Sequence, residues 1–305
     1  MGVLRTLCWF LPLVAASLSS AALAAPPKTY ATPEEAVQAL VNAARTESVE
    51  TVAGVLGSQS LSMLRSGDPV ADKADLLHFA EMYDQAHSML SPKENSQTLV
   101  LGDDEWPFPI PLVKGKTGWQ FDDAAGQREI LARRVGRNEL NAIQVCLAYV
   151  DAQREYQQRN PDGSTPPHFA DRLLSSQGKR DGLYWPSEPG QDESPLGPAV
   201  GGARQQGYAL AGGKRTPYHG YYYRILTAQG SHAEGGAVDY LVEGNLANGF
   251  ALVAYPAAWG NSGIMTFIVN QDGVVFQKDL GKNTASVAAS MKRFDPDDSW
   301  KETTP

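Results

Sequence analysis

The side chains that could carry out chemistry are few and scattered in this chain. A Ser-His-Asp hydrolase holds its serine in a sharp G-x-S-x-G turn, but Gly260–Gly263 matches that motif only in part and is typical of a plain turn. Zinc sites need histidines or cysteines at short, recurrent spacings, whereas His78 and His87 stand nine residues apart. We therefore expect no covalent nucleophile, no metal centre and no cofactor.

One segment has the spacing of a calcium-binding loop. Asn160, Asp162 and Ser164 alternate like the first, third and fifth ligands of such a loop, and Asp171 stands at the twelfth place. Thr165 replaces the glycine that these loops need at the sixth place. The same segment is also a strong signal for the end of a helix, so the sequence leaves calcium binding open.

The two cysteines offer no disulfide and no obvious nucleophile. Cys8 lies in the apolar N-terminal segment, and Cys146 stands between Val145 and Leu147 in a segment of helical pattern. No neighbouring positive charge would stabilise a thiolate at Cys146. We interpret Cys146 as a small buried hydrophobic residue.

Aromatic residues gather in two short segments, Tyr184–Pro186 and Tyr218–Tyr223. On a strand, Tyr221 and Tyr223 share one face and Tyr222 takes the other. We expect one face to be core and the face of Tyr221 and Tyr223 to form an exposed aromatic strip, because rings give contact area at low entropic cost. The candidate binding residues are Tyr184, Trp185, His219, Tyr221 and Tyr223.

The first 24 residues have the layout of a secretory signal peptide. Met1–Leu7 holds one positive charge, Arg5, and residues 7 to 16 are apolar. The run closes on Ala22-Leu23-Ala24, the small-residue pattern that signal peptidase cleaves. The sequence predicts a periplasmic or secreted chain beginning at Ala25, with no membrane-spanning segment after cleavage.

Composition limits the class of partner. The formal net charge is -8 and hydrophobic residues make up 42% of the chain, which is typical of a globular protein. A negative surface repels phosphate backbones, so nucleic acid is not an expected ligand.

Helices followed by short strands are predicted for residues 25–125. Thr32-Pro33-Glu34-Glu35 and Asp68-Pro69 are helix-start signals. Apolar spacing predicts helices over residues 33–44, 48–57, 61–64 and 69–90. Alternating patterns predict strands over residues 98–101, 108–113 and 118–121, with Trp106–Pro111 confined to a sheet edge by its prolines. These elements define a small α+β domain.

A long helix followed by strands is predicted for residues 126–305. The helix runs from about Gln127 to Arg159, and Leu140, Ile143 and Leu147 lie on the seam that packs against a flat surface. Strands are expected over residues 221–226, 238–242, 249–255, 264–269 and 274–278, with a final helix over residues 283–291. Residues 186–217 are expected to form a long surface loop, and the tail after Asp295 to be loose. The fold class is α+β, with two domains.

Two resemblances extend this interpretation. Six short pieces follow one another in the second half: Ala152–Tyr156, Gly182-Leu183, Gly220–Tyr223, Ala254–Pro256, Gly263–Phe267 and Asp272–Val274. In order and spacing they resemble the globular domain of type II secretion pseudopilins, which implies a long helix packed on an antiparallel sheet. Pseudopilins carry an apolar anchoring helix, however, and this chain has a cleavable signal instead.

Longer stretches match across the whole chain: Ser66–Asp72, Asp104–Pro111, Gly136–Leu140, Gly178–Pro186 and Thr266–Val274. Together they resemble a bacterial exported family of unknown function, DUF2950. Residues 25–125 also resemble, faintly, the cone-shaped folds similar to nuclear transport factor 2.

Two functions from different classes follow from these observations. The favoured hypothesis is a non-catalytic periplasmic binding or assembly module, which contacts another envelope protein through the aromatic residues named above. The alternative is an envelope hydrolase with its site between the two domains. An enzyme should show ionisable groups with perturbed pKa values that converge in a cleft. Such an arrangement is visible in a structure and not in a sequence.

Overall fold

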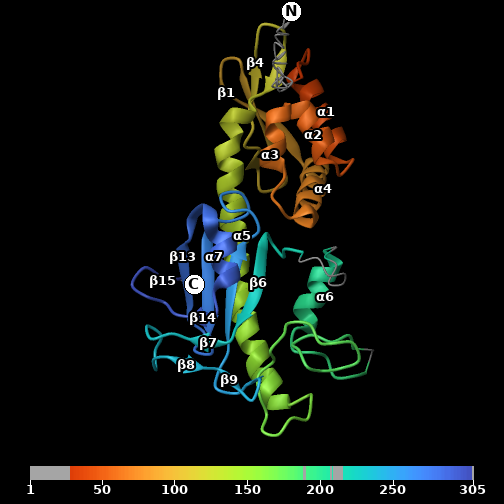
Figure 1. Ribbon diagram of the computed structural model, residues 1–305. Coiled ribbons are helices and arrows are strands. Elements are labelled where there is room, and N and C mark those ends of the chain that lie inside the picture. The colour runs from red at the N-terminus through yellow and green to blue at the C-terminus, as the bar shows by residue number, and fades with distance from the viewer. Residues whose placement is uncertain (1–27, 188–189, 207, 209–215, 304–305) are drawn as a thin grey trace, which may run out of the picture.

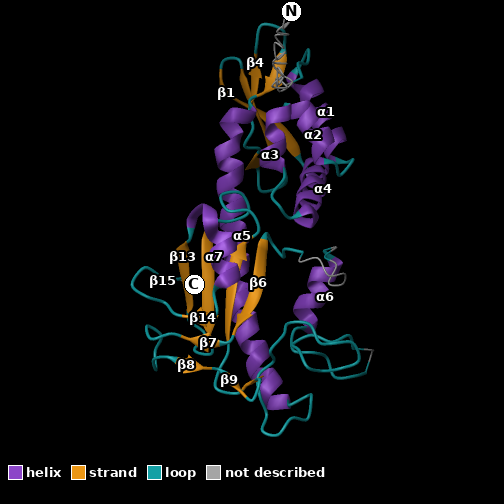
Figure 2. Ribbon diagram, in the orientation of Figure 1, coloured by secondary structure: helices purple, strands orange, loops and turns teal. Residues whose placement is uncertain are grey.

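The computed structural model describes residues 28–187, 190–206, 208 and 216–303, and the predicted signal peptide lies outside them. The described chain is elongated, and one long helix, α5 (Asp123–Arg159), runs along most of its length (Figure 1). One group of helices and strands surrounds the first turns of α5, and a second group surrounds the rest (Figure 1). The architecture is α+β, as the sequence predicts (Figure 2).

Four helices and one 3-10 turn begin the described chain: α1 (Pro33–Ala44), α2 (Val49–Leu56), η1 (Ser58–Ser60), α3 (Leu61–Leu64) and α4 (Pro69–Gln85). The starts of α1 and α4 are capped as predicted. The hydroxyl of Thr32 accepts from the backbone N–H of Glu35 at 3.1 Å, and the carboxylate of Asp68 accepts from the first turn of α4. These caps satisfy N–H groups that have no partner inside the helix.

Five strands form the first sheet: β1 (His87–Lys93), β2 (Ser96–Leu101), β3 (Trp106–Pro107), β4 (Leu112–Lys114) and β5 (Trp119–Phe121). Their order is β1-β2-β4-β5, with β3 paired to β2, and every pair is antiparallel. The predicted extension of the fourth helix to Leu90 is wrong. α4 ends at Gln85 because the following residues pair with β2, and Leu90 is 55% exposed.

α5 crosses the predicted boundary at residue 126 without a break. Its first turns pack on the first group, where a side chain at Gly126 would collide with Ile110 and where Ile130 joins the core of α1, α2 and α4. Its later turns pack on the second sheet, and Cys146 and Tyr149 are buried there. Leu140 departs from the predicted seam and is 67% exposed.

The second sheet is antiparallel in the order β15-β13-β12-β11-β6. The strands are β6 (Tyr221–Leu226), β11 (Ala251–Pro256), β12 (Met265–Asn270), β13 (Val275–Asp279) and β15 (Lys301–Glu302). Leu252 and Ala254 face α5, whereas Val253 and Tyr255 face the other side, where α7 (Thr284–Ser290) lies. The tail after Asp295 is not loose, because β15 pairs with β13.

Smaller elements complete the described chain. β7 (Ala228–Gln229), β8 (Val238–Asp239) and β14 (Arg293–Phe294) form a small sheet, and β9 (Leu241–Val242) and β10 (Asn245–Leu246) form a hairpin. η2 (Gly281–Asn283) precedes α7. The predicted loop over residues 186–217 contains a helix, α6 (Gly197–Gln205), which sequence patterning did not indicate. Among the described helices, none is long and apolar enough to cross a membrane.

Candidate ligand-binding cavity

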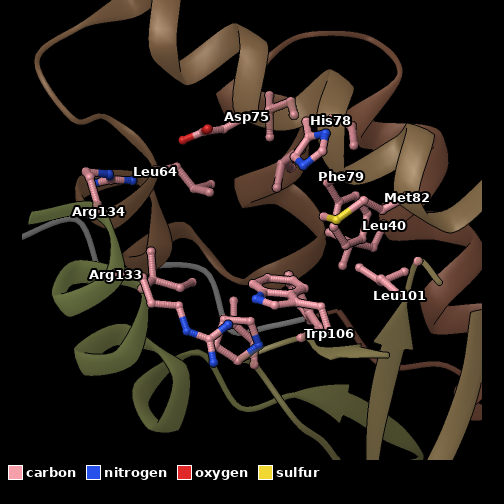
Figure 3. Close-up of a pocket in the computed structure, with 18 of the residues that line it drawn as sticks. Leu40, Leu64, Asp75, His78, Phe79, Met82, Leu101, Trp106, Arg133 and Arg134 are labelled. Carbon is pink, nitrogen blue, oxygen red and sulfur yellow. The ribbon is translucent and has the colours of Figure 1, made fainter. Parts of the chain in front are cut away.

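A cavity of about 730 Å³ lies in the first group of elements, between α4, β2–β3 and the first turns of α5 (Figure 3). This volume falls in the range of sites that hold small molecules. Most of the wall is apolar, with side chains from α1, α2, α4, β2 and α5. The apolar lining residues are Leu40, Ala44, Val52, Leu56, Leu64, Leu76, Phe79, Met82, Leu101, Trp106, Phe108, Ile110 and Ile130.

The lining is polarised along the cavity. Leu40, Phe79, Met82 and Leu101 gather on one side in Figure 3, and Arg133, Arg134 and Asp75 lie on the other. Asp72 and Arg137 also belong to the lining, and the exposed acids of the turn after β2, Asp103 and Asp104, lie on its rim. The cavity therefore offers an apolar compartment and a charged one to the same occupant.

Two of the charged groups are held by fixed partners. Arg137 binds Asp75 through two parallel hydrogen bonds of 2.9 and 2.8 Å. Asp72 accepts from the backbone N–H of Ser66 with both carboxylate oxygens, at 3.0 and 3.2 Å. Burial raises the pKa of Asp72, and the hydrogen bonds from Ser66 and the charge of Arg134 oppose that shift. These carboxylates serve structural contacts, which is not the arrangement of a free acid-base pair.

Arg133 is also paired but keeps a face toward the cavity. Its Nε donates to Glu129 at 2.7 Å, one turn earlier on α5. Its guanidinium lies 4.8 Å from the centre of the Trp106 ring, a cation–π contact that Figure 3 shows. Arg133 and Trp106 together form a flat, polar-edged wall.

Arg134 differs from its neighbours. It is 8% exposed, and its Nη1 donates to Oδ1 of Asn261 at 2.7 Å. No carboxylate of the described residues lies within 4.0 Å of its guanidinium. Burial lowers the pKa of Arg134, while Asp72 and Asp75 oppose this at longer range. A buried cation without a close counter-ion is costly.

A polar junction next to this cavity joins the two groups of elements. Asp68 is fully buried, and its Oδ2 accepts from the hydroxyl of Tyr208 at 2.8 Å and from the backbone N–H of Gly220 at 2.9 Å. Asn138 donates to the backbone carbonyl of Ser262 at 2.9 Å. Both carboxylate oxygens of Asp68 already accept hydrogen bonds from the protein, so Asp68 is not placed to act on a substrate, and the geometry gives no support to a hydrolytic site at this junction.

The predicted aromatic residues fall into two sets. Tyr221 is fully buried and Trp185 is 5% exposed, and both belong to the core under α5. The prediction that Tyr221 and Tyr223 share a face is correct, but α5 covers that face, so an open aromatic strip is not formed. Tyr184, His219 and Tyr223 are half-buried.

His219 and Tyr223 line a second cavity of about 650 Å³, to which α5 and α6 also contribute. Tyr208 and Tyr218 stand in the same wall, their ring centres 5.0 Å apart. Tyr184 and Trp185 are absent from the lining that is described, and the Tyr184 ring instead lies 5.2 Å from the Arg204 guanidinium. The structure thus brings together two of the five predicted residues.

The other predicted chemistry-bearing residues have ordinary structural roles. Cys146 is fully buried, and burial raises the pKa of its thiol to about 12. In the segment with the spacing of a calcium loop, Ser164 and Asn160 bond to each other, and Asp171 is paired with Arg172. Within the described residues, no group of three or more acidic, histidine or cysteine side chains is arranged to hold a metal ion.

Sequence reasoning missed the 730 Å³ cavity altogether. Its lining comes from segments more than ninety residues apart, Leu40 to Arg137, which no local motif links. One signal was available: Arg133, Arg134 and Arg137 follow one another on a helix that otherwise has an apolar seam. Adjacent arginines on a helix that must pack against other elements indicate a place where charge is brought to the interior.

The fold and the cavity define an α+β protein with a half-open, polarised site and no recognisable catalytic motif. The model of a family described as protein of unknown function (DUF2950) matches residues 27–303, so the chain belongs to this family. Neither the curated proteins nor the solved structures include a match to this chain. The similarity of the second half to pseudopilins stays a prediction.

Proposed function

We propose that this protein is a non-catalytic binding module of the cell envelope, and that the 730 Å³ cavity is its binding site. The single observation that carries the proposal is a cavity of ligand size with an apolar interior and a charged side. The charged groups support binding better than catalysis, because Asp72 and Asp75 are engaged in fixed hydrogen bonds. The envelope location rests on the signal-peptide pattern of residues 1–24.

Ala44 offers a direct test of the site. It lines the cavity and is 1% exposed, so a phenyl ring at this position would occupy space that a ligand needs. Ala39, on the same helix, is half-buried and is not part of the lining described, which makes Ala39→Phe a matched control. The probe is N-phenyl-1-naphthylamine, a neutral apolar dye whose fluorescence rises in an apolar site.

We expect the unmodified protein to bind the dye saturably. Ala44→Phe should weaken binding about tenfold or more, and Ala39→Phe should leave it nearly unchanged. Far-ultraviolet circular dichroism and the melting temperature of each variant establish that it is folded. Binding that is unsaturable, or equal in the two variants, would count against the cavity as a binding site.

A second proposal, contact with another envelope protein, is supported by the half-buried rings of Tyr184 and Tyr223. Tyr184 is the more accessible choice for a photo-crosslinking amino acid, since it lies outside the 650 Å³ cavity lining described. Val287, 40% exposed on α7, is the control position. A single adduct formed in living cells at Tyr184 and absent at Val287 supports the contact, and adducts at both positions or at neither argue against it.

A further inference from the structure

The three arginines that line the cavity are not equivalent in their pairing. Arg137 has Asp75 as a two-bond partner, and Arg133 has Glu129. Arg134 lies between them on α5 and is 8% exposed. Among the described residues, its only close partner is the neutral amide of Asn261. Of the three, Arg134 is therefore the one without a carboxylate of the described chain within 4.0 Å, and Asp72 and Asp75 act on its charge only at longer range.

A guanidinium carries five N–H donors in a planar fork. The bond to Asn261 uses one nitrogen of Arg134, Nη1. The remaining nitrogens are not among the buried side-chain atoms without a hydrogen-bond partner, so they are either bonded or accessible to solvent, and Arg134 is part of the cavity lining. This geometry suits an oxyanion that enters from the cavity and accepts two bonds.

The rest of the cavity restricts what such an anion can be. Opposite the arginines, Leu40, Phe79, Met82 and Leu101 provide an apolar compartment, with His78 beside Phe79 (Figure 3). The exposed acids Asp103 and Asp104 also belong to the lining. A small inorganic anion would leave this compartment empty, and a purely apolar molecule would leave Arg134 without a counter-ion in direct contact. Only a molecule with an anionic head and an apolar tail satisfies both ends.

We propose that the cavity binds a single-chain amphipathic anion, with its head group on Arg134 and its hydrocarbon tail between α1, α4 and β2. This inference rests on the proposed binding function and specifies its ligand. The head group is an oxyanion, either the carboxylate of a fatty acid or the phosphate of an alkyl phosphate. Asp75 stays on Arg137 in this arrangement, so the head group does not have to displace an existing ion pair.

Isothermal titration calorimetry with four ten-carbon probes separates head group from tail. Decanoate and decyl phosphate share the oxyanion chemistry, decan-1-ol is neutral, and decyltrimethylammonium is cationic. The variants are Arg134→Gln and, as a matched control, Arg128→Gln. Arg128 is an exposed residue of the same helix outside the cavity lining described, and this change removes the same charge.

We expect decanoate or decyl phosphate to bind about tenfold or more tightly than decan-1-ol, because charge-assisted hydrogen bonds are about twice as strong as neutral ones. Whichever of the two binds more tightly identifies the head group. Arg134→Gln should bring the ratio of the affinity for the anionic probe to the affinity for decan-1-ol close to one, and Arg128→Gln should leave this ratio unchanged. Arg134→Lys retains the charge but not the planar fork, so it should keep only part of this ratio. It is the variant to measure if Arg134→Gln does not fold.

Three results would overturn the inference. If decanoate, decyl phosphate and decan-1-ol bind equally to the unmodified protein, the ligand is apolar, and the binding function stands without its anionic head. If decyltrimethylammonium binds most tightly, the acids of the cavity dominate its potential. If no probe binds and the neutral dye also fails to bind, the proposed function itself is wrong.

Discussion

Asp68 gives the sharpest test of how the two groups of elements are joined. Its Oδ1 caps α4 by accepting from Val70 and Ala71, and its Oδ2 accepts from Tyr208 and Gly220. Asp68→Ala removes the cap, which costs about 1 kcal/mol. It also leaves two buried donors without an acceptor, at about 1–3 kcal/mol each. We expect the free energy of unfolding to fall by about 3–7 kcal/mol, since the site is fully buried.

Urea unfolding followed by circular dichroism, together with scanning calorimetry, measures this change. Asp84→Ala is the matched control, because Asp84 is 59% exposed and its ion pair with Arg45 is worth about 0–1 kcal/mol. Tyr208→Phe should cost about 1 kcal/mol, since the Asp68 carboxylate then loses one of several donors. If Asp68→Ala unfolds within about 1 kcal/mol of the unmodified protein, the junction does not stabilise the fold as argued.

Three further outcomes are expected. Burial and the charge of Arg137 lower the pKa of His219 below 6.5, and the charge of Asp68 opposes this shift, so the stability contribution is complete above that pH and decreases on acidification. Asparagine tolerates the φ of 49° at this position, so His219→Asn should make the melting temperature less dependent on pH between about pH 7.5 and 5.5. An unchanged pH dependence would contradict this. The Cys146 thiol, its pKa raised by burial to about 12, should resist iodoacetamide in the native protein and react once in denaturant, and alkylation of the folded state would be the contrary result. The exported protein should have the intact mass of a chain beginning at Ala25, which retention of residues 1–24 or a lipid on Cys8 would disprove.

The elements that the sequence predicts well are those with strong local signals. α1 begins at Pro33, after its cap Thr32, and α5 ends at Arg159, before its cap Asn160, because caps and apolar spacing agree there. The strand at Tyr221–Leu226 is correct to the residue, since its three tyrosines and its β-branched Ile225 all favour a strand. In each case the local preference and the tertiary packing point to the same structure.

The missed elements are those that tertiary contacts decide. The helical spacing of α4 continues past Gln85, but pairing of His87 with Leu101 starts a strand instead. α6 is rich in glycine and was missed because glycine is a poor helix former. β15 is polar, and only its pairing with β13 makes it a strand.

The candidate site could not be predicted for a related reason. The apolar lining residues, such as Leu40 and Phe79, have the pattern of ordinary core positions, and a gap between core side chains has no sequence signature. The aromatic cluster attracted attention because its rings are dense, yet Tyr221 and Trp185 are core. Whether an aromatic face is exposed depends on what covers it, and here the cover is α5.

The most direct test of the cavity as a binding site is methyl NMR of the methionines during titration with decanoate. Met82 lines the cavity, whereas Met265 and Met291 belong to the second group of elements, and Met82→Leu assigns the resonance. We predict a saturable shift that is largest at Met82 and negligible at Met265 and Met291. A largest shift at Met265 or Met291, or no shift at Met82 at saturation, would contradict the account.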